Sequence, residues 1–129
     1  MSSPLLLAVD DEMGVRESLK MVFAKEYRLL EAASVEAAIR KVQEEKPQIV
    51  LLDILMPKTD GIEILRQIKL IHPSCEVIML TGVNSQQLAA KAMDFGAFDF
   101  VGKPFDVVDL REKVKKALEN LAQKTQAHH

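Results

Sequence analysis

Short apolar runs alternate with segments of helical spacing along the chain, and this alternation limits the folds that it can adopt. Three runs, LLLAV, IVLL and VIML, have no polar residue at every second position. Such runs are typical of strands that are covered on both faces of a parallel sheet. FDFV is a weaker run, and YRLLEA has the mixed character of an edge strand. In chain order the five runs occupy residues 5–9, 27–32, 49–52, 77–80 and 98–101.

The segments that follow these runs repeat apolar residues every three or four positions, which predicts helices with one buried face. Asp60 with Glu63, and Asn84 with Gln87, resemble capping boxes at the starts of helices. Gly96 stands where a helix is expected to end in a left-handed residue. Five strand–helix units predict an α/β fold, in which a parallel sheet lies between two layers of helices joined by right-handed crossovers.

The length of 129 residues suits one domain, which we expect to span residues 1–123. The last helix of this domain is expected to end near Leu121. Residues 124–129 end in two histidines, and we interpret them as a linker or tag remnant.

Composition argues against several classes of protein. The net charge of −2 offers no basic field for nucleic acid. The apolar runs are too short to cross a membrane, and the N-terminus lacks the basic start and cleavage site of a signal peptide. The single cysteine, Cys75, cannot form an internal disulfide, which suits a reducing compartment. We therefore expect a cytoplasmic protein that binds neither nucleic acid nor membrane through this segment.

Polar residues follow four of the five predicted strands at the point where each strand ends. They are Asp10 and Asp11, with Glu12 next to them, after the first strand, Asp53 after the third, Thr81 after the fourth and Lys103 after the fifth. Taken singly, the carboxylates could cap helices or turns, the threonine could belong to a turn, and the lysine could be solvated. The carboxyl ends of parallel strands share one edge of a sheet, where ligands bind in open α/β folds. The complementary charges at that edge predict a site.

The predicted site combines three carboxylates with one ammonium and one hydroxyl. Carboxylates crowded together repel one another unless a cation neutralises them, and one lysine leaves a deficit of about two charges. A divalent cation bound through oxygen, such as Mg²⁺, would cover it. A carboxylate beside such an ion, a lysine and a hydroxyl is suited to attack a phosphoryl group. The residues thus predict an aspartyl phosphate.

Four motifs resemble those of one family across nearly the whole chain, the receiver domains of two-component response regulators. The motifs are VDDE (9–12), LLDILMPKTDG (51–61), MLTG (79–82) and VGKPF (101–105). The resemblance implies a doubly wound, flavodoxin-like three-layer fold with the strand order 2-1-3-4-5. It also implies a signalling domain that is not a turnover enzyme, and that catalyses only its own phosphorylation from a phosphodonor and its own dephosphorylation.

The resemblance assigns the acceptor and the metal ligands. It implies that Asp53 takes a phosphoryl group from a sensor histidine kinase or a phosphotransfer protein. Asp11 would bind Mg²⁺ directly, or Mn²⁺ as a substitute, while Asp10 would assist through water. Asp53 itself and the backbone carbonyl of Leu55 would complete the protein ligands.

The resemblance also assigns the residues that respond to the phosphoryl group. Thr81 would donate a hydrogen bond to it, and Lys103, followed by a cis bond to Pro104, would pair with it. Phe100, which on sequence alone could equally be a core residue, would turn inward as the switch aromatic. The response would reach the face formed by the fourth helix, fifth strand and fifth helix, where a homodimer could form. We expect the controlled output to be transcription.

Two apolar residues border the predicted site, Leu55 two positions after Asp53 and Val83 two positions after Thr81. We expect them to hinder the attacking water and so to lengthen the lifetime of the phosphoryl group. Leu55 also argues against the main alternative, a small phosphatase of the haloacid-dehalogenase type, which would carry an acidic residue at this position. A flavodoxin-like binding module would need a phosphate loop rich in Ser, Thr and Gly, whereas DDEMG would repel phosphate.

Overall fold

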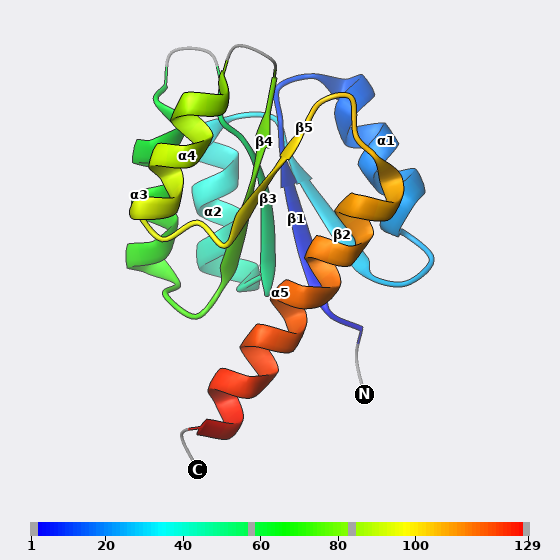
Figure 1. Ribbon diagram of the computed structural model, residues 1–129, viewed down its shortest axis with the longest axis vertical. Helices are drawn as coiled ribbons and strands as arrows, with labels where there is room; N and C mark the ends of the chain where they lie inside the picture. Colours follow the sequence, from blue (N-terminus) through cyan, green and yellow to red (C-terminus); the bar gives the residue numbers. More distant parts are fainter. Residues whose placement is uncertain (1–2, 57–58, 83–84, 128–129) are drawn as a thin grey trace.

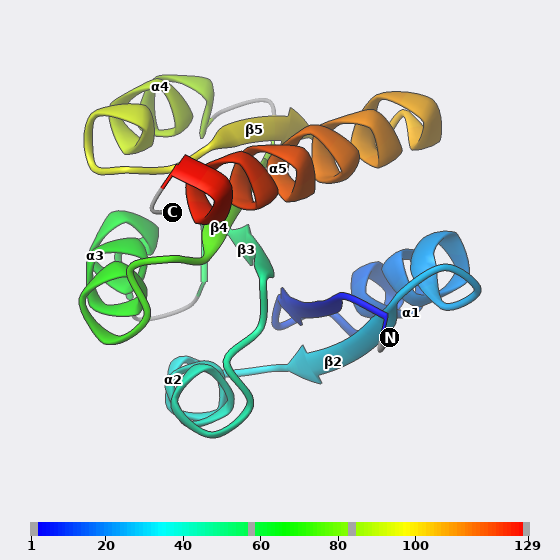
Figure 2. The same ribbon diagram turned by 90° about the horizontal axis from the view of Figure 1, so that it is seen from below.

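The computed structural model describes residues 3–56, 59–82 and 85–127, and over these it confirms the predicted alternation of strands and helices. All strand pairs are parallel, and the sheet order is β2-β1-β3-β4-β5, as expected. Figure 2 shows α1 and α5 on one face of the sheet and α2, α3 and α4 on the other. The strands are β1 (Leu5–Val9), β2 (Arg28–Ala32), β3 (Ile49–Asp53), β4 (Glu76–Thr81) and β5 (Asp99–Gly102). The helices are α1 (Met13–Phe23), α2 (Val35–Glu45), α3 (Gly61–Ile71), α4 (Gln86–Asp94) and α5 (Val107–Ala127).

The three central strands are buried along their whole length, which explains their continuous apolar sequences. Because successive side chains of a strand point to opposite faces, each strand contributes to two cores. Leu7 and Val50 belong to the core under α2, α3 and α4, whereas Leu6 and Leu51 belong to the core under α1 and α5. β2 lies at an edge and is only partly buried, as its mixed sequence predicts.

The helix starts differ in how they are capped. Asp60 caps α3 by accepting a hydrogen bond from the backbone N–H of Ile62 at 2.9 Å, so the predicted helix start is confirmed. The N-cap of α4 is Ser85, while Asn84 of the predicted capping box lies outside the described residues. Gly96 has a φ of 100° directly after α4, which confirms its left-handed conformation.

The last helix is longer than the sequence suggested, and the expected end near Leu121 is wrong. α5 continues to Ala127, and Figure 1 shows its final turns extending past the body of the domain. No glycine or proline interrupts residues 107–127, which are rich in good helix formers. Asn120, just before the expected end, and Lys124, beyond it, contact the buried carboxylate of Glu76 at the start of β4, at 2.5 and 3.6 Å. The division of the chain after residue 123 stays a prediction.

Within the described part of the chain, no helix has the length and apolar character that crossing a membrane requires.

Candidate functional site

The register of the sheet brings the predicted strand ends together. Val9 is paired with Leu52, so Asp10 follows β1 beside the Asp53 that ends β3. Asp53 is paired with Leu80, one residue before Thr81. Thr81 is in turn paired with Gly102, one residue before Lys103. The parallel pairing therefore places all these residues at one edge, as their positions in the sequence predict.

Lys103 joins the carboxylates of two different strands. Its ammonium donates a hydrogen bond to Oδ2 of Asp10 at 2.7 Å and lies 3.6 Å from Oδ1 of Asp53. Its backbone N–H donates to the carbonyl of Thr81 at 2.7 Å, and the Lys103–Pro104 bond is cis, as expected. Burial alone would lower the pKa of Lys103, but the hydrogen bond to Asp10 and the charge of Asp53 outweigh it and raise that pKa. Lys103 is thus a fixed cation in the site.

Asp53 is almost buried, with an exposed fraction of 5%. Its Oδ1 accepts a hydrogen bond from the backbone N–H of Leu55 at 3.1 Å, and this hydrogen bond helps to orient the carboxylate. Burial raises the pKa of Asp53, and the charge of Asp10 raises it further, while the Leu55 hydrogen bond and Lys103 oppose these effects. The structure therefore presents a carboxylate that a neighbouring cation would help to keep ionised.

The acidic loop after β1 combines one buried and two exposed carboxylates. Asp10 is fully buried, whereas Asp11 and Glu12 are exposed, and ligand atoms of the three lie within 4.8 Å of one another. Oδ1 of Asp10 accepts from the backbone N–H of Glu12 at 2.9 Å. Carboxylate oxygens with excess negative charge are suitable ligands for a hard divalent cation. The negative charge of Asp11 also raises the pKa of Asp53, which shows that the two carboxylates interact. The residues present therefore fit the predicted magnesium site.

Arg16 supports this loop, and sequence reasoning missed it. Its Nη1 donates to the backbone carbonyl of Asp10 at 2.8 Å, and its Nε lies 3.2 Å from Oε1 of Glu31 on β2. Glu12 was also missing from the predicted ligand set, although it stands in the VDDE motif. The signal for Glu12 was its place next to two aspartates, while Arg16 could be found only from the fold.

Thr81 is buried at the end of β4, but its hydroxyl is engaged away from Asp53. The described contacts of its Oγ1 are the carbonyl of Gly82 at 3.1 Å and the hydroxyl of Ser85 at 2.5 Å. Both side chains have exposed fractions of 1%. The structure thus places Thr81 at the site without turning its hydroxyl to the acceptor.

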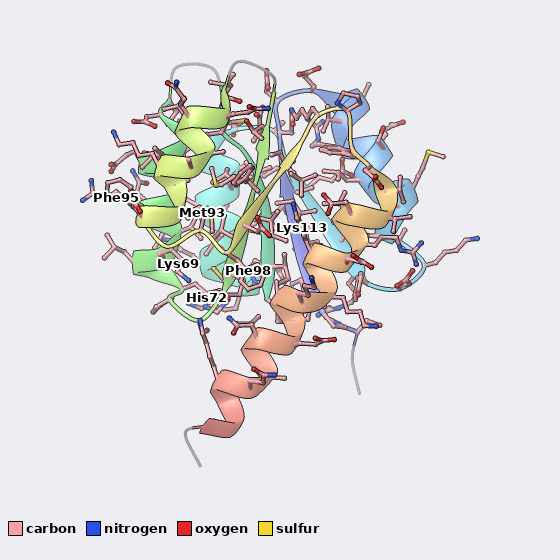
Figure 3. All side chains as sticks on the ribbon, in the orientation of Figure 1. Lys69, His72, Met93, Phe95, Phe98 and Lys113 are labelled. Carbon is pink, nitrogen blue, oxygen red and sulfur yellow. The ribbon has the colours of Figure 1, made fainter. Side chains whose placement is uncertain are left out.

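The remaining predicted residues differ in what the structure says of them. Phe100 is half-buried against the core under α2, α3 and α4, with the ammonium of Lys113 5.9 Å from its ring centre. Lys113, labelled on α5 in Figure 3, also donates to the carbonyl of Phe100 at 2.8 Å. The side chain of Leu55 is 54% exposed beside Asp53. Val83 lies outside the described residues.

A groove of about 490 Å³ opens beside the charged residues, between α1 and the loop that connects β5 to α5. Its lining includes the charged residues Lys103 and Glu12 and the apolar residues Val15, Val22 and Phe105. The groove therefore offers an apolar docking surface next to the charged site.

The chain is similar to proteins of one family. The model for the response regulator receiver domain matches residues 6–115. Sporulation initiation phosphotransferase F of Bacillus subtilis (strain 168) is 39% identical over 119 residues, which cover 92% of this chain and 96% of that protein. The alkaline phosphatase synthesis transcriptional regulatory protein PhoP of the same strain is 34% identical over 88% of this chain and 48% of that protein. The crystal structure of a CheY-like receiver domain protein from Methanospirillum hungatei JF-1 has a TM-score of 0.89 and 28% identity, covering 95% of this chain and 99% of that one.

The doubly wound fold and its acidic edge define a signalling domain, and the chain belongs to the response regulator receiver domain family of two-component systems. Receiver domains generally use Mg²⁺ at an acidic pocket, and they interact with histidine kinases or phosphotransfer proteins. The predicted class of protein is therefore confirmed.

Proposed function

We propose that the chain is a phosphoacceptor module in which Asp53 takes a phosphoryl group from the phosphohistidine of a sensor kinase or phosphotransfer protein. The observation that carries this proposal is the position of Lys103, whose ammonium contacts carboxylates from both β1 and β3 at the edge of the sheet. An oxygen of Asp53 attacks the phosphorus, the bond from phosphorus to the imidazole nitrogen breaks, and the electron pair of that bond returns to the imidazole. The product is an aspartyl phosphate at residue 53.

The other residues of the site hold charge during this transfer. Bound Mg²⁺, or Mn²⁺ in its place, would neutralise the phosphoryl oxygens, held by Asp11, by Asp53, by the backbone carbonyl of Leu55 and, through water, by Asp10. Lys103 exchanges its contact with Asp53 for one with the new phosphoryl oxygens, and so compensates their charge. Thr81 donates its hydroxyl hydrogen to one of these oxygens.

The phosphodonor reaches Asp53 through the groove between α1 and the β5–α5 loop. The apolar lining of the groove suits the amphipathic helix of a phosphohistidine-bearing partner. Lys103, which also lines the groove, lies 3.6 Å from the acceptor Asp53. The groove supports a docking mode in which apolar contact gives affinity and the charged edge carries the chemistry.

The phosphoryl group shifts a two-state equilibrium whose output is the face of α4, β5 and α5. Phe100 on β5 turns inward when Thr81 moves, and this face is also where a homodimer would form. A shift from 1:99 to 99:1 requires about 5.5 kcal/mol of differential stabilisation. We propose a transcriptional output in the cytoplasm, without nucleic-acid binding by this segment, and the similarity to the transcriptional regulatory protein PhoP supports it. The chain is not a turnover phosphatase, since Leu55 leaves no general acid two residues after Asp53.

The proposal is tested by incubating the protein with acetyl phosphate and Mg²⁺ and measuring its intact mass. The unsubstituted chain is expected to gain the mass of one phosphoryl group, and Asp53→Asn is expected to gain none. Asp99→Asn, which changes a carboxylate at the far end of β5, is the matched control and should gain the same mass as the unsubstituted chain. A gain that survives Asp53→Asn would refute the assignment.

A further inference from the structure

Ser85 lies in contact with Thr81 at the start of α4 and has no place in the reaction described above. Its hydroxyl oxygen is 2.5 Å from Oγ1 of Thr81. Both residues are buried, with exposed fractions of 1%. A second contact of 3.1 Å joins the Ser85 hydroxyl to the carbonyl of Gly82, and Thr81 reaches that same carbonyl at 3.1 Å. Three polar groups therefore form a closed triangle.

The hydrogens of this triangle can be counted. Two hydroxyls bring two hydrogens to three contacts, so only two of the contacts can be hydrogen bonds at one time. Either Thr81 donates to Ser85 while Ser85 donates to Gly82, or Ser85 donates to Thr81 while Thr81 donates to Gly82. The carbonyl of Gly82 also accepts the backbone N–H of Ser85 at 3.2 Å, which leaves it one free lone pair for a hydroxyl. In both arrangements the hydrogen of Thr81 stays inside the triangle.

Ser85 is free to hold Thr81 because it does not cap its own helix. It is the N-cap of α4, yet its side chain makes no capping hydrogen bond, and its φ of −120° and ψ of 16° differ from the extended conformation of an N-cap. Ser34 at the start of α2 shows the usual alternative, with ψ at 165° and its hydroxyl accepting from the backbone N–H of Ala37. The hydroxyl of Ser85 is thus committed to Thr81 and Gly82.

We propose that Ser85 is a positioning residue that holds the hydroxyl of Thr81 in the unphosphorylated arrangement and so sets how readily the domain switches. The inference rests on the proposed function, because it assumes that Thr81 donates to a phosphoryl group on Asp53. When Thr81 moves to that group it loses the Ser85 contact, and the hydroxyl of Ser85 then donates to the carbonyl of Gly82, whichever arrangement it started from. The Ser85–Thr81 hydrogen bond therefore favours the unphosphorylated state alone.

The test uses Mg²⁺ and beryllium fluoride, which forms a phosphoryl mimic on a carboxylate, and follows binding by amide NMR. Ser85→Ala is expected to bind this mimic more tightly, by up to about five-fold, because Thr81 keeps only its 3.1 Å contact with the carbonyl of Gly82 once its 2.5 Å contact with Ser85 is gone, and a whole neutral hydrogen bond contributes about 1 kcal/mol. Even without the mimic, the α4 amide signals of Ser85→Ala are expected to move part of the way toward their positions in the loaded unsubstituted chain. If Ser85 had only a structural role, its substitution would not move the α4 amide signals from their free positions toward their mimic-loaded positions.

Two further variants show whether Ser85 acts through Thr81. In a Thr81→Ala background, Ser85→Ala is expected to leave the affinity unchanged, because the hydrogen bond it removes is already absent. Ser34→Ala removes a serine that does cap its helix, and it should destabilise α2 without changing the affinity.

The outcomes separate this inference from the proposed function. Equal or weaker binding by Ser85→Ala would overturn the role of Ser85 while leaving Asp53 as the acceptor. The same gain in affinity in the Thr81→Ala background would overturn the action through Thr81. If the unsubstituted chain fails to bind the mimic at Asp53, the proposed function falls, and the inference falls with it.

Discussion

At the residue scale, the central observation is that a fully buried carboxylate depends on one lysine. Asp10 has an exposed fraction of 0%, and Lys103 donates to it at 2.7 Å. A buried charge without a partner is strongly unfavourable, whereas the intact pair adds little net stability. The arrangement therefore serves the site more than the stability of the fold.

Lys103→Met is expected to lower the free energy of unfolding by about 2 kcal/mol in metal-free buffer, because it leaves Asp10 without its cation. This loss of unfolding free energy is smaller than that expected for breaking a fully buried ion pair, because the Lys103 side chain is 20% exposed. Urea unfolding measures it. Asp10→Asn in the Lys103→Met chain is the control and should recover most of the loss. If the double variant is less stable than Lys103→Met, the pairing is not the cause.

Leu55→Asn combined with Val83→Glu is expected to shorten the life of the phosphoryl group. Both substitutions replace an apolar residue, two positions after Asp53 or Thr81 in the sequence, with a polar one that can orient an attacking water. The loss of phosphate after removal of the donor, followed by intact mass, measures the lifetime. Leu70→Asn is a matched control, because Leu70 is 82% exposed on α3 and borders no part of the site. An unchanged or longer lifetime in the double variant would contradict the expectation.

His72 gives the fold a pH dependence at the opposite end of the sheet from the site (Figure 3). Burial lowers the pKa of His72, and the charges of Lys46 and Lys69 lower it further, against the hydrogen bond to the carbonyl of Pro47. The unfolded chain then takes up a proton first as the pH falls through about 6.5. The contribution of His72 to stability is therefore full above that pH and declines below it.

His72→Gln is expected to flatten the change in unfolding free energy between pH 7.5 and 5.5, roughly one unit on either side of the unperturbed pKa. Gln can still donate to the carbonyl of Pro47, but it cannot take up a proton. Urea unfolding at several pH values gives both curves, and their difference isolates His72 from the carboxylates that also titrate. A difference that does not vary with pH would contradict the assignment.

At the scale of the elements, the sequence predicts the strands better than it predicts the contacts between loops. Because β1, β3 and β4 are buried along their whole length, their sequences are continuous apolar runs. A polar residue stands at the end of each run, so the positions of the site residues could also be predicted. The contact between Arg16 and the carbonyl of Asp10 left no such pattern, because it depends on how α1 is placed against the sheet. The length of α5 could have been predicted, because no glycine or proline interrupts residues 107–127. The contacts of this helix with Glu76 could not, because Glu76 is distant in sequence.

The loop between β3 and α3 depends on a glycine at the first position of the helix. A Cβ on Gly61 would overlap the backbone carbonyl of Ile54, whereas a Cβ on Gly14, in the first turn of α1, would meet nothing within 4 Å. Backbone cannot yield as a flexible side chain can, so Gly61→Ala is expected to cost about 2 kcal/mol or more. Gly14→Ala should instead stabilise by up to about 1 kcal/mol. Thermal or urea unfolding compares the two, and equal effects would contradict this explanation.

At the scale of the whole molecule, parallel pairing turns a linear order of residues into a site. Asp10, Asp53, Thr81 and Lys103 are far apart in the chain, but adjacent strands place them at one edge. This much could be predicted, because the carboxyl ends of parallel strands must meet. The exact partners could not, since the choice of Lys103 for Asp10 and of Thr81 for Ser85 follows from side-chain packing.

The central claim is that Asp53 of the intact chain carries the phosphoryl group. Treatment with acetyl phosphate and Mg²⁺, followed by reduction with borohydride, converts an aspartyl phosphate to homoserine and leaves other aspartates unchanged. Peptide mass mapping then identifies the residue. We expect homoserine at position 53 and aspartate at positions 10 and 11. Homoserine at position 10 or 11, or at neither of these nor at position 53, would contradict the account.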